Sequence, residues 1–236
     1  MAHPNLAELE NAVKSAREHQ DLKAEVSALR QLGSLYQRNR QFTKAASCLL
    51  KAITIVEKTG NDQDLAVVEA HLGCVYWEMA QLKKAMTCFQ KALKVQKQNQ
   101  SASGQMGLLT LLGISHWRKC QWEEGLSFFK EALSLRKTQD LKAGKPSEAE
   151  EEFSVLSEAL ERGVTTLQNR IRLGREQNDP LKILQPIFSM IPLYLFTGRR
   201  KGVDSLLKEA GTLAEQLQKK DVLDAIPRLR ELSENY

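Results

Sequence analysis

The sequence has little proline, few aromatic residues and no sign of a β-sheet. Only six of its 236 residues are proline and 6% are aromatic. No stretch alternates Val, Ile, Thr and aromatic residues with polar ones, as half-buried strands do. Residues that favour helices, such as Ala, Leu, Glu, Lys and Gln, are abundant instead. We therefore predict an all-α protein.

Long apolar segments are also absent. The longest, such as residues 191–196, are far shorter than the about 20 residues that a membrane-spanning helix needs. Residues 1–12 carry neither the basic region nor the apolar core of a secretory signal. These features predict a cytoplasmic protein that does not contact a membrane.

The cysteines lack the spacing of a metal site. Cys48, Cys74, Cys88 and Cys120 form no CxxC pair, and no histidine lies near them at ligand spacing. We interpret all four as reduced, packed thiols of a cytosolic protein, and we expect no metal.

Motifs of catalysis and of nucleic-acid binding are missing too. The sequence has no Gly-rich phosphate loop, no GxSxG and no HExxH, and its four histidines are scattered. Three carboxylates at residues 150–152 fit a solvated first helical turn. The net charge of +5 comes without a dense Lys/Arg block. We expect no catalytic residue, no cofactor and no nucleic-acid partner.

The strongest positive signal is a repeat of 40 residues. The motif Leu-Gly-x-x-Tyr contains Gly33 in its first copy, Gly73 in its second and, with His116 in place of Tyr, Gly113 in its third. Bulky and small residues follow each glycine at fixed offsets. These positions are Phe42, Ala45, Leu49 and Ala52; Leu82, Ala85, Phe89 and Ala92; and Trp122, Gly125, Phe129 and Ala132. Small residues let two helices approach closely, and hairpins that cannot bury their apolar face alone stack on one another.

This pattern resembles the tetratricopeptide repeat family. The common unit of that family has about 34 residues, and the longer unit here is similar to repeats of cytoskeletal, polarity and motor adaptors and of some bacterial regulators. The resemblance implies a right-handed α-solenoid of antiparallel helix hairpins. The expected parts are an N-terminal half-repeat cap helix in 1–20, three repeats in 21–140 (about 22–58, 62–98 and 102–138), and degenerate helical repeats with a C-terminal cap in 147–236.

The C-terminal third departs from the pattern. Pro146 ends any helix before Ser147, which forms a capping box with Glu150. Asp179-Pro180 predicts a second helix start. Two prolines inside the next helix, at 186 and 192, predict a kinked or broken helix. An apolar cluster in this region either continues the core or docks a second chain as a homodimer: Leu184, Phe188, Ile191, Leu193, Leu195 and Phe196.

The resemblance also implies a peptide-binding groove on the concave face, lined by the first helix of each repeat. The family's groove positions correspond here to Arg30, Ser34, Gln37, Arg38, Ala70, Cys74, Trp77, Glu78, Thr110, Ile114, Trp117 and Arg118. Trp77 and Trp117 share one groove position in adjacent repeats, and tryptophan is enriched in binding hot spots. The alternative is that both pack under neighbouring helices or under the C-terminal segment.

The resulting expectation is a non-enzymatic scaffold or adaptor. It would capture a peptide or helix of another protein that offers an apolar or aromatic anchor and acidic residues. Two alternatives stay open: a peptide-responsive regulator of a signalling protein, and a helical-repeat protein that binds nucleic acid.

Overall fold

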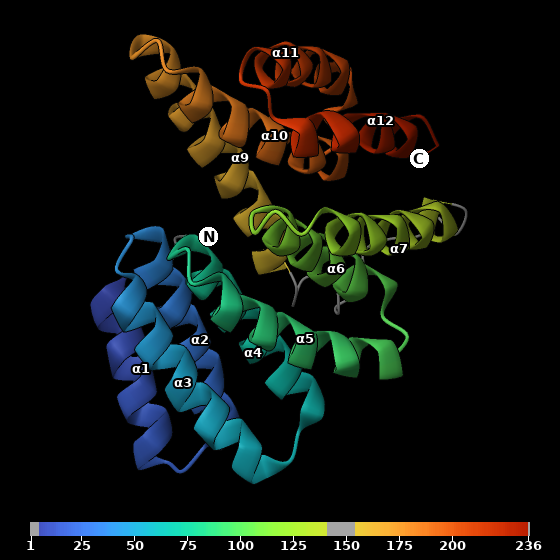
Figure 1. The fold of residues 1–236 in the computed structure, drawn as a ribbon. Helices are drawn as coiled ribbons and strands as arrows, with labels where there is room; N and C mark the ends of the chain where they lie inside the picture. Colours follow the sequence, from blue (N-terminus) through green and yellow to red (C-terminus); the bar gives the residue numbers. More distant parts are fainter. Residues whose placement is uncertain (1–4, 141–153, 236) are drawn as a thin grey trace. The chain divides into compact units, whose positions relative to one another are not determined.

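The computed structural model describes residues 5–140 and 154–235, and these residues form eleven α-helices and one 3-10 turn (Figure 1). The all-α class predicted from the sequence is confirmed. The helices are α1 (Leu6–Glu18), α2 (Leu22–Arg38), α3 (Phe42–Thr59), α4 (Asp62–Glu78), α5 (Leu82–Gln98), α6 (Ala102–Trp117), α7 (Trp122–Asp140), α9 (Ser154–Glu176), α10 (Pro180–Phe196), α11 (Val203–Gln216) and α12 (Lys220–Asn235), with the turn η1 (Arg200–Gly202) before α11.

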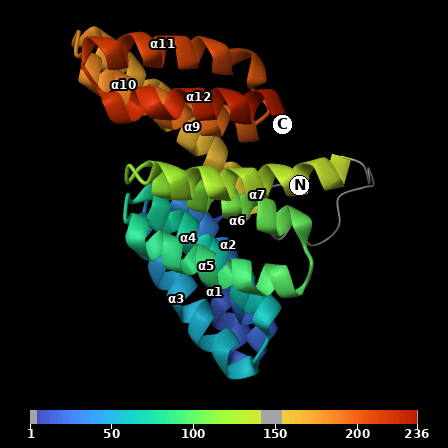
Figure 2. The same ribbon diagram turned by 45° about the vertical axis from the view of Figure 1, so that its right-hand side comes forward.

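The chain divides into two compact units. Unit 1 comprises residues 1–101 and contains α1 to α5, and unit 2 comprises residues 102–236 and contains α6 to α12. Within each unit, helices that are joined by a short described turn pair as hairpins, as α2 with α3 and α6 with α7 do (Figure 2). The predicted capping box of Ser147 and the carboxylates at 150–152 lie outside the described residues.

Each hairpin turn among the described residues contains a residue with left-handed backbone geometry, and these residues recur every 20 positions. They are Gln20, Arg40, Gly60, Ala80, Gln100 and Cys120, and later Asn178, Gly198 and Gln218. At all of these turns except the one at Gly60, the next N–H donates to a carbonyl five residues back, as Gln41 does to Tyr36 at 2.8 Å. This Schellman arrangement satisfies carbonyls at the helix end. The 40-residue repeat is therefore two halves of 20 residues with the same ending.

Capping side chains begin several helices. Asn61 accepts the backbone N–H of Asp64 at 3.1 Å, directly after the left-handed Gly60 that ends α3. Asp179 accepts the N–H groups of Leu181 and Lys182, with Pro180 at the first helical position. The helix start at Asp179-Pro180 was predicted from the sequence.

The glycine of each repeat marks the closest approach of two paired helices. A β-carbon on Gly73 would lie 2.5 Å from the ring of Phe89, and one on Gly33 would lie 3.1 Å from Leu49. Gly113 faces Phe129 in the same way. The bulky side chain at this offset therefore fills the space that the glycine leaves, as the repeat pattern predicted.

Of the kinked or broken helix predicted after Asp179, the break is absent, because α10 runs without interruption through Pro186 and Pro192. Pro192 has no N–H to donate to the carbonyl of Phe188. The indole N–H of Trp117 donates to that carbonyl instead, at 3.2 Å. Near Pro186, the carbonyl of Lys182 lies close to Gly174 of α9. A donor on a neighbouring helix thus compensates for Pro192.

We expect opposite effects of substitutions at two turn residues. Gly60→Ala places a β-carbon in open space, so it should lower the free energy of unfolding only through left-handed strain, by about 1 kcal/mol. Arg40→Gly should raise it by roughly 0.5–1 kcal/mol. Urea denaturation followed by circular dichroism measures both. Changes of the same sign would contradict this account of the turns.

A double-mutant cycle tests the bond between Trp117 and the Phe188 carbonyl. Trp117→Phe should lower the free energy of unfolding by about 3 kcal/mol, because it removes ring volume and leaves a buried carbonyl unpaired. In a Pro192→Ala background, the new backbone N–H can pair with that carbonyl. The same Trp117→Phe change should then cost about 1 kcal/mol less. Equal costs in both backgrounds would show that the indole N–H does not compensate for Pro192.

Candidate functional site

The predicted groove positions fall on the first helix of each repeat, and the two units contain them separately. Unit 1 holds those on α2 and α4, and unit 2 holds those on α6.

In unit 1, three predicted groove residues are joined through a buried histidine. The Gln37 amide of α2 donates to the carboxylate of Glu78 on α4. Its carbonyl oxygen lies 3.0 Å from Nε2 of His71, which therefore acts as the donor. Ser34 Oγ lies 3.4 Å from the same nitrogen. Gln37 and His71 are each only 3% exposed, whereas Ser34 and Glu78 are half-buried. The network thus connects the first helices of two adjacent repeats and reaches the surface at both ends.

The arginines predicted for the groove differ in exposure. Arg38 is exposed and Arg30 is half-buried, both on α2. In unit 2, Arg118 is also half-buried, and its burial, followed by the charge of Arg170, lowers its pKa. Arginine keeps its charge in proteins, so all three remain cations.

Seven of the predicted groove residues are buried, so they do not line an exposed groove. They are Gln37, Ala70, Cys74, Trp77, Thr110, Ile114 and Trp117. The exposed fraction is 5% for Trp77 and 1% for Trp117. In this structure both tryptophans are core side chains, so neither offers a surface to a partner.

Trp117 lies at the centre of an aromatic cluster in unit 2. Its ring centroid is 4.7 Å from Trp122, 5.0 Å from Phe188 and 5.8 Å from Phe129. Phe196 extends the cluster from Phe129 at 5.5 Å. The third repeat and the degenerate helix α10 therefore share one core. This is the alternative considered for Trp117, packing under the C-terminal segment.

The apolar cluster of α10 is part of the same core. Leu184, Phe188, Ile191, Leu193 and Leu195 are all buried within the chain, and Phe196 is half-buried. These side chains are therefore not an exposed surface for a homodimer.

Three of the four cysteines are buried as predicted, but Cys120 is exposed, which corrects that part of the interpretation. Cys120 occupies the left-handed position that ends α6, and a residue there points away from the hairpin core. Burial is the main cause that raises the pKa of Cys48 and of Cys88. The described residues contain no group of three or more His, Cys, Asp or Glu side chains that could hold a metal ion.

His116, which replaces the repeat tyrosine, packs against a ring rather than a reactive group. Its ring centroid lies 5.2 Å from that of Phe128. Burial lowers the pKa of His116, while the charge of Glu124 raises it less.

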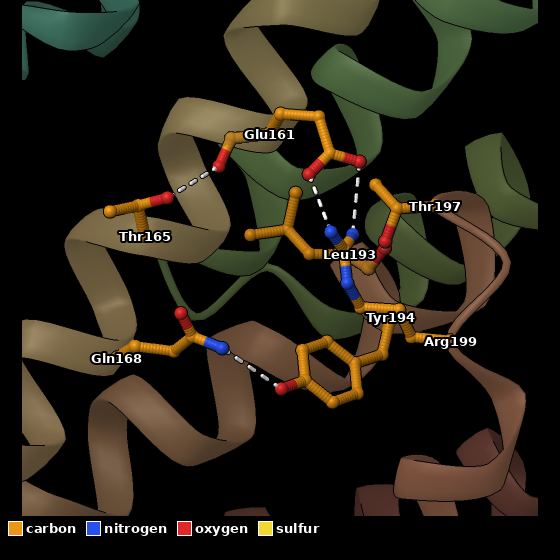
Figure 3. A network of polar contacts seen from close by, with 7 residues as sticks. All are labelled: Glu161, Thr165, Gln168, Leu193, Tyr194, Thr197 and Arg199. Atoms are coloured by element: carbon orange, nitrogen blue, oxygen red, sulfur yellow. Dashed lines mark hydrogen bonds and ion pairs between the residues drawn. The ribbon is translucent and has the colours of Figure 1, made fainter.

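Sequence reasoning missed a cavity in unit 2. It has a volume of about 540 Å³ and lies between α9, α10 and α11 beside η1. Two of its lining residues are hydrogen-bonded, because Gln168 donates to the Tyr194 hydroxyl at 3.2 Å (Figure 3). In the same network of polar contacts, Arg199 binds both carboxylate oxygens of Glu161 at 2.9 and 2.7 Å. The Arg199 guanidinium lowers the pKa of Glu161. This region has no counterpart among the predicted groove positions.

Comparison with known proteins supports the repeat assignment for part of the chain. Residues 25–98, which contain the network of Gln37, His71 and Glu78, match the sequence profile of the tetratricopeptide repeat family. A comparison with curated protein sequences gave no match. No helix among the described residues is both long and apolar enough to cross a membrane.

Solved structures share the fold at low sequence identity. BtubC (BKLC) from P. vanneervenii is 16% identical with a TM-score of 0.52, and the match covers 98% of this chain and 91% of that one. The apo form of RapI is 12% identical with a TM-score of 0.56, and the match covers 98% of this chain and 77% of RapI. At these identities the likeness concerns the fold alone.

Removing the central amide tests the network in unit 1. Gln37→Ala deprives buried His71 and half-buried Glu78 of a hydrogen bond each, so it should lower the free energy of unfolding by about 2–3 kcal/mol. Gln31→Ala on the exposed side of α2 should cost less than about 0.5 kcal/mol. Urea denaturation measures both variants. Equal costs would show that the network contributes nothing to stability.

Proposed function

We propose that this protein is a non-enzymatic interaction scaffold that binds a peptide or helix of a partner protein. The proposed binding face lies in unit 1 and is formed by α2 and α4. The main observation in its favour is the network of Ser34, Gln37, His71 and Glu78, which joins groove positions of two adjacent repeats. The match of residues 25–98 to the tetratricopeptide repeat family supports this use of the fold, because such repeats generally bind proteins.

The charges on α2 suggest the chemistry of the partner. Arg30 and Arg38 lie two helical turns apart, on either side of Ser34. Residues three or four apart in a helix share one face, so these positions follow one line along α2. Guanidinium groups bind carboxylates through paired hydrogen bonds. We therefore expect a partner segment with acidic side chains that runs along α2.

The buried histidine is better suited to holding the face than to catalysis. His71 Nε2 is engaged by Gln37 and Ser34, and the Gln37 amide is engaged by Glu78. A general base needs a free lone pair directed at a substrate. The network instead fixes two first helices at one spacing, which pre-organises a binding face and lowers the entropy lost on binding.

Charge reversal on α2 tests the proposed face. Peptides selected from a phage-displayed library against the full chain would be synthesised, and their Kd measured by fluorescence anisotropy. For a peptide from the proposed site, Arg30→Glu together with Arg38→Glu should weaken binding by on the order of tenfold or more. Lys51→Glu with Lys58→Glu changes the net charge equally on the exposed side of α3, and should weaken it less than about twofold.

Other outcomes would favour other functions. Equal losses in both double variants would indicate non-specific attraction and contradict the face. Tight binding of an oligonucleotide, with an affinity that falls steeply with salt, would favour nucleic-acid binding. A change in the small-angle scattering of the protein on adding the peptide would favour a peptide-responsive regulator over a static adaptor.

A further inference from the structure

The cavity of unit 2 is built from parts of four successive elements. The residues that line it come from α9, α10, η1 and α11. They are Gln168, Ile171, Arg172, Arg175, Glu176, Met190, Tyr194, Gly202, Ser205, Leu206 and Glu209. A volume of about 540 Å³ lies within the range of ligand sites in proteins and accommodates a large side chain with its neighbouring backbone.

The floor of the cavity is apolar. Ile171, Met190 and Leu206 are buried, and each comes from a different helix. The Tyr194 ring closes one side against Gly202, where a β-carbon would lie 2.7 Å from the ring. The Tyr194 ring can therefore occupy this position only because Gly202 has no side chain. An apolar ligand group that enters the cavity would contact side chains from all three helices.

The rim carries two ion pairs that a ligand can replace. Arg172 pairs with Glu176 at 2.6 Å and Arg175 pairs with Glu209 at 2.7 Å, and both arginine side chains are more than half exposed. Pairs this exposed contribute little to stability because water screens them. The Tyr194 hydroxyl accepts from Gln168, so its own proton is available for an acceptor. Exchanging Glu176 or Glu209 for a ligand carboxylate therefore costs little.

Positive charge is concentrated around this cavity. Residues 168–176 and 199–209 contain seven Arg and Lys against three Asp and Glu, in a chain whose net charge is +5. Arg199 pairs with Glu161. Arg200 and Lys201 directly precede Gly202, and both are exposed. The surroundings of the cavity thus favour a negatively charged ligand.

We propose that the cavity of unit 2 binds an acidic segment of a partner protein, with one apolar side chain inserted between Ile171, Met190 and Leu206. Carboxylates on either side of that anchor pair with Arg172 and Arg175. The floor favours a peptide over a nucleic acid, because nucleotides stack on aromatic rings and the cavity offers only Tyr194. This site is formed by α9 to α11, apart from the proposed face on α2 and α4, so the two proposals stand or fall separately.

The experiment uses the full chain labelled with ¹³C at its methionine methyl groups. Five methionines are present, and Met190→Leu assigns the resonance of Met190. The probe is the peptide acetyl-Asp-Glu-Leu-Glu-Asp-amide. Titration should shift the Met190 resonance in a saturable way. Binding should be at least fivefold weaker for acetyl-Asn-Gln-Leu-Gln-Asn-amide, which lacks the charges, and for acetyl-Asp-Glu-Gly-Glu-Asp-amide, which lacks the anchor.

Variants link the shift to the rim. Arg172→Gln with Arg175→Gln should weaken binding at least fivefold. Lys219→Gln with Arg230→Gln removes the same charge from exposed positions near and on α12, and should leave binding within twofold. Circular dichroism and Tm establish that each variant is folded. Ser205→Trp, which fills the cavity from α11, is a second variant that should abolish the Met190 shift without changing the charge.

Several results would overturn the proposal. A Met190 resonance that does not move, or the same affinity for all three peptides, would exclude an acidic segment with an apolar anchor. Unchanged binding in the arginine variant would exclude the rim as the site of recognition. A twelve-residue oligothymidylate that competes with the peptide and binds more tightly would identify the cavity as a nucleic-acid site instead.

Discussion

The close contact between the two helices of each hairpin is the constraint on which the other features of the repeats depend. At Gly73 a single β-carbon would collide with Phe89, and Gly113 and Phe129 form the same pair in unit 2. Because the helices touch here, the residues that face the contact after each glycine must also be small. The alanines at 45, 52, 85, 92 and 132 occupy such positions and are fully buried. The left-handed turn every 20 residues then reverses the chain direction and gives the helices similar lengths. The 40-residue repeat in the sequence thus reflects one packing geometry that recurs in each hairpin.

Unit 2 shows how this geometry tolerates a sequence that has lost the motif. Helix α10 contains two internal prolines, yet it keeps its place because Trp117 of the third repeat donates to the carbonyl that Pro192 leaves unpaired. The same tryptophan packs on Phe188 and Trp122. One side chain therefore supplies both apolar contact and the missing hydrogen bond. This dual use explains why a residue that looks like a binding anchor belongs to the core.

The two proposed sites follow from different physical features. On α2 and α4, a buried hydrogen-bond network around His71 fixes the spacing of two helices and presents arginine on the same face. Between α9 and α11, an apolar floor and exposed ion pairs leave room for a ligand group. The first site has a rigid support and a charged surface, and the second has a cavity with replaceable rim contacts. Both suit acidic partner segments, which agrees with the positive charge of the chain.

The sequence by itself determined the helical class, the 40-residue period and the helix start at Asp179, because these depend on local propensity and on spacing along one chain. The family resemblance also predicted which residues stand at groove positions, but not which of them are exposed. The sequence suggested Trp77 and Trp117 as binding anchors, and only the tertiary structure showed that both are buried. His71 and the residues of the unit 2 cavity were not predicted, although the excess of Arg and Lys in 168–176 and 199–209 was visible in the sequence. Only the tertiary structure decided whether a side chain lies at the surface or in the core. It also decided whether the carbonyl four residues before a helical proline finds another donor. Both depend on contacts between residues that are far apart in the chain.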